Sequence, residues 1–185
     1  QTCALPISVS KAALACGALV PLHTTLLQQQ ELEPFVVREL QAFPRPARQE
    51  AGPRSNPFLP WDRPLEVARL ALGHVLLLNK YPVQDSHLLI ITSDWQPQNG
   101  WLRQQDWDAV AEVAADTGGL WFFNSSSTAG ASQPHRHLQL LPRRTDEISC
   151  PLASELLRQL QGEREPWDWA YRLSPRSDPM GASDL

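Results

Sequence analysis

Two histidines and a glutamine at alternate positions are the residues of this sequence best suited to chemistry. They are His135, His137 and Gln139, in the run Gln-Pro-His-Arg-His-Leu-Gln that spans 133–139. Because successive side chains of a β-strand point to opposite faces, a strand here would place all three on one face and Arg136 on the other. Sheet faces over a core are normally apolar. The pattern therefore indicates either a site or a pair of histidines on a solvated face.

A neutral imidazole is suited to nucleophilic attack on phosphorus. Its reference pKa is about 6.5, so a large fraction is unprotonated near neutral pH. Attack by one ring nitrogen requires that the other carry a proton and donate it to an acceptor. That acceptor could be a histidine two positions away or a backbone carbonyl. Gln139 could then donate its amide N–H to a phosphoryl oxygen, without offering an acidic proton.

The ten residues that precede the histidines have a composition suited to binding a polyphosphate. Residues 124–133 read Asn-Ser-Ser-Ser-Thr-Ala-Gly-Ala-Ser-Gln, with hydroxyls, amides and a glycine but no large side chain. Small residues let backbone N–H groups approach a ligand closely, and hydroxyls add further donors. The segment is not a P-loop, because no Gly-x-x-x-x-Gly-Lys-Ser/Thr occurs. A flexible serine-rich loop is the alternative, but the segment leads directly into the histidines, which favours phosphate binding.

The apolar pattern predicts the elements that must position these residues. Two apolar runs, 74–79 and 87–92, are typical of buried antiparallel strands, and 120–124 and 136–141 predict two more. The other predicted elements are a strand over 33–40, an extended proline-rich loop over 42–64, and helices over 8–20, over 104–117 and, capped by Ser149 and ended by Gly162, around 152–160. Strands in hairpin order with helices between or after them predict an α+β fold built on an antiparallel sheet.

Composition limits the classes of partner. The 185 residues, 42% of them hydrophobic, suffice for one domain or one domain plus an extension. A net charge of −4 without a Lys/Arg run argues against stable binding to nucleic acid. The three cysteines are widely spaced, which indicates neither a disulfide framework nor a zinc knuckle and favours a reducing, cytoplasmic location. No stretch approaches the ~20 apolar residues of a membrane span, so we expect no membrane partner.

Several runs together closely resemble the diadenosine tetraphosphate phosphorylases, which are ATP adenylyltransferases of the histidine-triad superfamily. The most specific run is Gly-Ala-Ser-Gln-Pro-His-Arg-His-Leu-Gln at 130–139. Supporting runs are Asn-Pro-Phe-Leu-Pro at 56–60, Leu-Asn-Lys-Tyr at 78–81, His-Leu-Leu-Ile-Ile-Thr at 87–92 and Phe-Phe-Asn-Ser-Ser at 122–126. The resemblance implies a histidine-triad-like antiparallel sheet flanked by helices.

The resemblance also implies a role for individual residues. His137 matches the nucleophile that becomes adenylylated, His135 shares its motif, and Gln139 matches a phosphate-contacting glutamine. His87 falls at a matching strand position, whereas we expect the other two histidines, His23 and His74, to be structural. Nucleotide- and phosphate-binding positions are implied at Arg54, Asn79, Lys80, Asn124, Gly130, Ala131, Ser132, Gln133 and Gln139. The resemblance implies no metal ligand and no covalently bound cofactor, and it leaves room for Mg²⁺ that enters with a nucleotide.

The activity implied is reversible cleavage of diadenosine tetraphosphate by inorganic phosphate, giving ATP and ADP through an adenylyl-histidine intermediate. The implied ligands are therefore ATP, ADP, the dinucleotide and phosphate. We expect a leader of non-native origin at 1–8, because this segment does not resemble a natural amino terminus. The amino-terminal catalytic domain is expected at 9–165 and a polar tail at 166–185, and relatives continue well past this length. The carboxy-terminal segment of the family, with further binding residues, would then be missing, which leaves the activity of this fragment open.

Other functions fit parts of the pattern. A histidine-triad hydrolase would carry His rather than Gln at position 139. A galactose-1-phosphate uridylyltransferase shares His-x-His-x-Gln, but its common zinc ligands have no counterpart among these cysteines. A metal-binding module without catalytic activity could use His135 and His137 with His87 as a third ligand. A nucleotide-binding or interaction protein is the other non-enzymatic alternative.

Overall fold

The computed structural model describes residues 4–27, 34–42, 56–142 and 150–175, and the description below is of these ranges. The predicted binding residue Arg54 and the predicted helix cap Ser149 lie outside them. The described elements are, in chain order, α1 (Ala4–Ala15), β1 (His23–Leu27), β2 (Val37–Ala42), η2 (Arg63–Leu65), β3 (Glu66–Leu70), η3 (Ala71–Gly73), β4 (His74–Leu78), β5 (Leu88–Thr92), α2 (Gln104–Ala114), β6 (Gly119–Phe122), η4 (Ser127–Ala129), β7 (His137–Pro142) and α3 (Ala153–Leu160).

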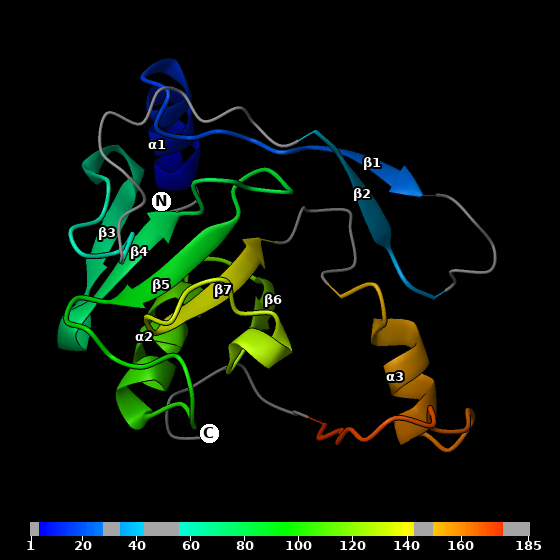
Figure 1. The fold of residues 1–185 in the computed structure, drawn as a ribbon. Helices are drawn as coiled ribbons and strands as arrows, with labels where there is room; N and C mark the ends of the chain where they lie inside the picture. The colour runs from blue at the N-terminus through cyan, green and yellow to red at the C-terminus, as the bar shows by residue number, and fades with distance from the viewer. Residues whose placement is uncertain (1–3, 28–33, 43–55, 143–149, 176–185) are drawn as a thin grey trace.

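Five strands form one antiparallel sheet in the order β3-β4-β5-β7-β6. The two apolar runs predicted as an antiparallel pair are its neighbours β4 and β5, in which Leu76 lies opposite Ile90. The strand β7, which begins at His137, is inserted between β5 and β6 (Figure 1). A separate ribbon of β1 and β2 extends away from this sheet, towards α3. The α+β prediction is confirmed.

One face of the sheet is covered by α1 and α2. Their buried side chains pack on alternate residues of the central strands. The cluster comprises Ala13, Leu19, Leu65, Leu76, Leu78, Leu88, Ile90, Ala109, Val110, Val113, Leu138 and Leu140. Hydrophobic burial of this kind is the main favourable contribution to folding. This face accounts for half of the apolar residues in β4 and β5.

The opposite face carries a second apolar cluster, on which the predicted site borders. Val75, Leu77, Leu89 and Ile91 pack there against Phe58 and Trp61, which lie in the segment before β3. Since both faces of β4 and β5 are covered, these strands are apolar at nearly every position instead of alternating. In β7, His137 lies opposite Ile91 and Gln139 opposite Leu89. The two polar side chains therefore extend this second face, as the alternation predicted.

Several predicted boundaries were wrong. The helix predicted over 8–20 is α1, which begins earlier and ends at Ala15, because Gly17 turns the chain with φ 75°. Residues 4–8 of the predicted leader form its start, while the origin of that segment stays a prediction. The strand predicted over 33–40 is β2, which begins only at Val37. Before it, the Phe35 ring packs against the rings of Trp167 and Trp169.

The strands β1 and β3 were not predicted. They lie at the edges of their sheets, and the burial of their residues is only partial. The strand predicted over 120–124 is β6, which ends at Phe122. At its start, Gly119 runs so close to the Leu141 carbonyl oxygen that any Cβ would collide with it. Among the described residues, no helix is long and apolar enough to cross a bilayer.

Candidate active site

His137 is a buried histidine whose neutral ring is held in one tautomer. Its Nδ1 lies 2.7 Å from the carbonyl oxygen of His135. A carbonyl only accepts, so Nδ1 carries the proton and donates it, and Nε2 keeps a lone pair. Burial lowers the pKa of His137 below its ordinary value, although the hydrogen bond to His135 opposes this effect. Of the two acceptors considered from the sequence, the structure selects the backbone carbonyl.

His135 is fully buried, and both of its ring nitrogens have partners. Its Nε2 lies 2.9 Å from the carbonyl oxygen of Thr92 and 2.9 Å from the Thr92 hydroxyl. Its Nδ1 lies 2.9 Å from Nδ2 of Asn56. Burial lowers its pKa; the hydrogen bond to the Thr92 carbonyl opposes this effect, and the proximity of His137 adds to it. With both ring nitrogens engaged, His135 contributes its carbonyl to His137 and offers no free ring nitrogen to a ligand.

Gln139 and Asn79, which were singled out separately, are joined through His87. The Oε1 of Gln139 lies 3.0 Å from Nε2 of His87, and Nδ2 of Asn79 lies 3.2 Å from Nδ1 of His87. Burial lowers the pKa of His87, while the hydrogen bond to Gln139 opposes this effect. Gln139 is half-buried and lies on the same face of β7 as His137. The structure thus brings together three of the predicted site residues, Asn79, Gln139 and His137.

Lys80 follows Asn79 and is paired with an acid that sequence reasoning missed. Its Nζ lies 2.8 Å from Oδ2 of Asp62, and both side chains are partly exposed. Only two lysines occur in the sequence, and the other, Lys11, is exposed on α1. The pairing is compatible with a cation that exchanges Asp62 for a phosphate, because exposed ion pairs contribute little to stability.

The loop over 124–133 contains a short helical turn, η4, and a tight bend. The Ser126 hydroxyl accepts a hydrogen bond from the Ala129 N–H at 3.2 Å, and Gly130 then adopts φ 91°. Such a positive φ favours glycine strongly. The hydroxyl-bearing residues Ser125, Ser127, Thr128 and Ser132 are exposed, and Ala131 and Gln133 are half-buried. The loop therefore presents donors to solvent beside the histidine strand, and its ligand stays a prediction.

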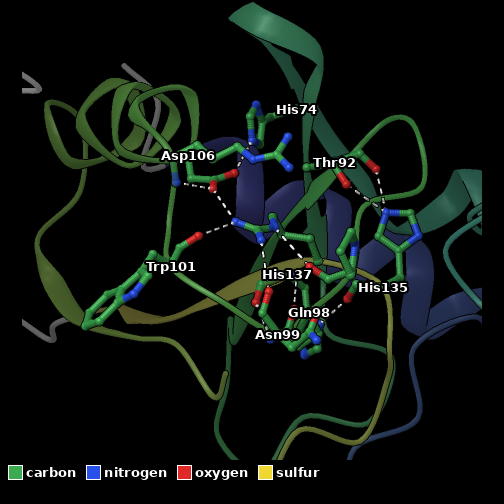
Figure 2. Close-up of polar contacts among 11 residues, drawn as sticks. His74, Thr92, Gln98, Asn99, Trp101, Asp106, His135 and His137 are labelled. Atoms are coloured by element: carbon green, nitrogen blue, oxygen red, sulfur yellow. Dashed lines mark hydrogen bonds and ion pairs between the residues drawn. The ribbon is translucent and has the colours of Figure 1, made fainter. Parts of the chain in front are cut away.

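Gln98 links this loop to His137 and was not singled out from the sequence (Figure 2). Its Oε1 accepts from the His137 N–H at 2.8 Å, and its Nε2 donates to the His137 carbonyl at 3.1 Å and to the Asn124 carbonyl at 2.7 Å. The side chain is 3% exposed. Because β6 ends at Phe122, opposite Gln139, the amide of Gln98 serves His137 as a neighbouring strand would. No local pattern marks it, since its partners are 26 and 39 residues away.

Arg136 projects to the other face, where it anchors the strand to α2. Its Nη1 lies 2.7 Å from Oδ2 of Asp106, whose Oδ1 lies 3.0 Å from Nε2 of His74 (Figure 2). Burial would raise the pKa of Asp106, but hydrogen bonds from His74, Arg136 and the Arg103 N–H hold it below its usual range. The remaining N–H groups of Arg136 donate to the carbonyls of Pro97, Asn99 and Trp101. His74 thus has the structural surroundings that the sequence predicted.

The described residues contain no group of three or more His, Cys, Asp or Glu side chains placed to hold a metal ion. The proposed third ligand of a metal module, His87, has hydrogen-bond partners at both ring nitrogens, as His135 has. Only Nε2 of His137 has no partner among the described hydrogen bonds of these three rings. This geometry supports a nucleophile more than a metal ligand set.

Comparison with known proteins decides the family. The sequence model described as "Ap4A phosphorylase N-terminal domain" matches residues 5–158, which is most of the chain. The chain belongs to this family. Two proteins of Saccharomyces cerevisiae are similar over shorter stretches. Diadenosine 5',5'''-P1,P4-tetraphosphate phosphorylase 2 is 32% identical over 100 residues, and Protein APA1 is 36% identical over 76 residues.

Solved structures of an Ap4A phosphorylase share the fold. Yeast Ap4A phosphorylase Apa2 in complex with AMP matches 78% of this chain with a TM-score of 0.61 and 25% identity. The same protein in complex with Ap4A matches 92% of the chain with a TM-score of 0.64 and 23% identity. The aligned part covers 31% and 24% of the two sequence relatives, and 51% and 60% of the two structures. The chain therefore spans less than two thirds of the length of each of these relatives.

Proposed function

We propose that this chain is the amino-terminal catalytic part of a nucleotidyltransferase that cleaves diadenosine tetraphosphate with inorganic phosphate to ATP and ADP. The observation that carries the proposal is the state of His137. Its Nδ1–H is donated to the His135 carbonyl at 2.7 Å, so Nε2 has a lone pair available for attack. Family membership supports the same chemistry, and two of the similar proteins, diadenosine 5',5'''-P1,P4-tetraphosphate phosphorylase 2 and Apa2, are named as phosphorylases of this dinucleotide.

The proposed reaction consists of two displacements at one phosphorus atom. Nε2 of His137 attacks the α-phosphorus of the dinucleotide, the N–P bond forms, and the bridging P–O bond breaks with its electrons on the departing ATP. An oxygen of inorganic phosphate then attacks the adenylyl phosphorus. The N–P bond breaks, its electrons return to Nε2, and ADP leaves. Both steps depend mainly on positioning and on stabilisation of negative charge at phosphoryl oxygens.

The neighbouring polar groups are assigned to that charge. Gln139, on the same face of β7, donates its amide N–H to a phosphoryl oxygen of the group bound to His137. Lys80 exchanges Asp62 for a phosphate, and Asn124 with residues 130–133 supplies further donors. Arg54 keeps its predicted binding role, and Mg²⁺ enters only with a nucleotide. We place the reaction in the cytoplasm, with no nucleic-acid or membrane partner.

A hydrolase of the histidine-triad superfamily is the second candidate, and position 139 argues against it. A histidine there could be protonated and could pass a proton to a leaving group, whereas the amide of Gln139 cannot. Attack of water on adenylyl-His137 would therefore be poorly assisted. Inorganic phosphate is already anionic and needs less proton handling as an acceptor.

Product analysis with and without phosphate tests this function. The 185-residue chain, and the same chain extended by the carboxy-terminal segment of a relative, would be incubated with the dinucleotide. We expect ATP and ADP to accumulate only when phosphate is present. We also expect Gln139→His to lose this transfer and to gain, at most weakly, hydrolysis to ATP and AMP. Release of mainly AMP by the native protein, whether or not phosphate is present, would replace the transferase with the hydrolase.

A further inference from the structure

Two asparagines hold two histidines of the site in the same way. The Oδ1 of Asn56 accepts the Phe58 N–H at 3.0 Å, and its Nδ2 lies 2.9 Å from Nδ1 of His135. The Oδ1 of Asn79 accepts the Tyr81 N–H at 3.1 Å, and its Nδ2 lies 3.2 Å from Nδ1 of His87. In both cases the asparagine closes a turn onto a backbone N–H two residues later. The backbone thereby determines which atom of the amide faces the histidine.

This arrangement fixes the proton of the histidine. Because the Asn79 oxygen is used by the backbone, its NH₂ group faces Nδ1 of His87 and can only donate. Nδ1 must then be the unprotonated acceptor, so the single proton of a neutral His87 lies on Nε2. Nε2 lies 3.0 Å from Oε1 of Gln139 and donates to it. The oxygen of Gln139 is therefore engaged, and its NH₂ group is the end left for a ligand.

We propose that Asn79 and His87 are positioning residues that hold the Gln139 amide with its nitrogen towards the phosphoryl group transferred to His137. The inference rests on the proposed function, in which Gln139 donates to that group. The two ends of a carboxamide are nearly equal in shape, so only their hydrogen bonds decide which end faces a ligand. The reversed amide would place an oxygen against a phosphoryl oxygen, which repels instead of stabilising it. The series of hydrogen bonds from the Tyr81 N–H through Asn79 and His87 thus determines which end of the Gln139 amide faces the phosphoryl group.

The surroundings of His87 favour its neutral form. Burial lowers its pKa, and its partners are the two amides and the ring of Phe122, whose centroid is 6.1 Å away. Two ionisable groups lie on the elements that hold it. His137 shares its strand face with Gln139, and burial lowers its pKa too. Lys80, next to Asn79, is paired with Asp62. No carboxylate among the described residues has a contact with His87, and the hydrogen bond to Gln139 is the one described contact that opposes the effect of burial on its pKa.

Asn79→Asp tests which atoms donate and which accept in the hydrogen bonds that join Asn79, His87 and Gln139. A carboxylate can only accept, so in this variant Nδ1 of His87 must carry a proton. When His87 is doubly protonated, Nε2 still donates to Gln139. Above the pKa of His87 in the variant, the one remaining proton stays on Nδ1, Nε2 becomes an acceptor, and Gln139 must turn its NH₂ group to it. The ¹⁵N shifts of the two ring nitrogens of His87 report the tautomer directly in the 185-residue chain, without any turnover.

We expect the Nε2–H tautomer of His87 in the native chain and the Nδ1–H tautomer in Asn79→Asp at alkaline pH. Asn56→Asp is the matched control, since it makes the same change beside His135 and should leave His87 as Nε2–H. The proposal is overturned if native His87 is the Nδ1–H tautomer, if Asn79→Asp keeps the native tautomer at every pH, or if Asn56→Asp also switches His87.

The rate of adenylyl transfer to His137 provides a second readout. Loss of one correctly placed donor to a developing oxyanion costs about 10²-fold in rate. We therefore expect the transfer rate of Asn79→Asp to fall about 100-fold as pH rises through the pKa of His87, beyond a pH-independent loss of nucleotide affinity caused by the added charge. A variant rate that is lowered equally at all pH values would mean that Asn79 only supports the fold. If no adenylyl-histidine forms even in the native chain, the proposed function fails. The tautomer of His87 still tests the hydrogen bonds that join Asn79, His87 and Gln139.

Discussion

Replacement of Gln98 by leucine should disturb His137 without removing any group that takes part in the proposed reaction. The side chain of Gln98 accepts the His137 N–H at 2.8 Å and donates to the carbonyls of His137 and Asn124. Leucine has a similar size but can do neither. The substitution would leave the N–H and the carbonyl of His137 without their partner in a buried environment.

The expected effect is large because the groups are buried. A buried polar group that loses its partner costs about 1–3 kcal/mol, so two such groups reduce the free energy of unfolding by roughly 2–6 kcal/mol. Typical domains have only about 5–15 kcal/mol in total. Since His137 would also lose the bonds that fix its backbone, we expect slower adenylyl transfer in whatever fraction of Gln98→Leu remains folded.

Urea denaturation of the native chain, Gln98→Leu and Gln105→Leu measures this effect. Gln105 is exposed on α2, and an exposed substitution of this kind typically changes stability by no more than about 0.5 kcal/mol. We expect Gln98→Leu to unfold at a much lower urea concentration than Gln105→Leu. Equal midpoints for the two variants would show that Gln98 does not complete the hydrogen bonding of β7.

Two further predictions concern charge. Lys80→Ala should weaken nucleotide binding, because a neighbouring residue does not replace a cation that contacts a phosphate. Lys11→Ala on α1 should leave binding unchanged. Equal affinities of the two variants in low-salt calorimetry would mean that Lys80 pairs only with Asp62 and does not bind the nucleotide. Burial lowers the pKa of His87, His135 and His137 below the ordinary value of 6.5, so the unfolded chain binds more protons than the folded one just below that pH. The contribution of these histidines to the free energy of unfolding should therefore be fully present above pH 6.5. Below that pH it should decrease by up to about 1.4 kcal/mol per pH unit for each histidine. Urea midpoints that stay constant from pH 7 to 5 would contradict this expectation.

The central strands could be predicted because their burial produces a clear pattern of apolar residues in the sequence. β4 and β5 are covered on both faces, so each is an unbroken apolar run, while β7 alternates because one of its faces carries the site. The edge strands β1 and β3 have no such signal, since their residues are only partly buried. Helix ends also escaped prediction where a glycine with positive φ, such as Gly17, ended the helix before its apolar pattern did.

The candidate site was predictable in its residues but not in its connections. His137 and Gln139 could be singled out by type and spacing, and Asn79 by the resemblance to a known family. The roles of Gln98 and His87, in contrast, depend on partners far away in the sequence. The Nε2 of His87, for example, reaches Gln139 across 52 residues. Likewise, the sequence left two acceptors open for Nδ1 of His137. The fold decides for the His135 carbonyl, because the adjacent His135 ring is turned to Thr92 and Asn56.

Mass spectrometry of the chain after incubation with the dinucleotide or ATP shows directly whether His137 is the nucleophile. We expect one added AMP, located on His137 by fragmentation, labile in acid as expected for a phosphoramidate and removed by inorganic phosphate with release of ADP. His137→Ala should show no added AMP and should still bind nucleotide. An adenylyl group on another residue, or full labelling of His137→Ala, would contradict the claim that Nε2 of His137 is the nucleophile.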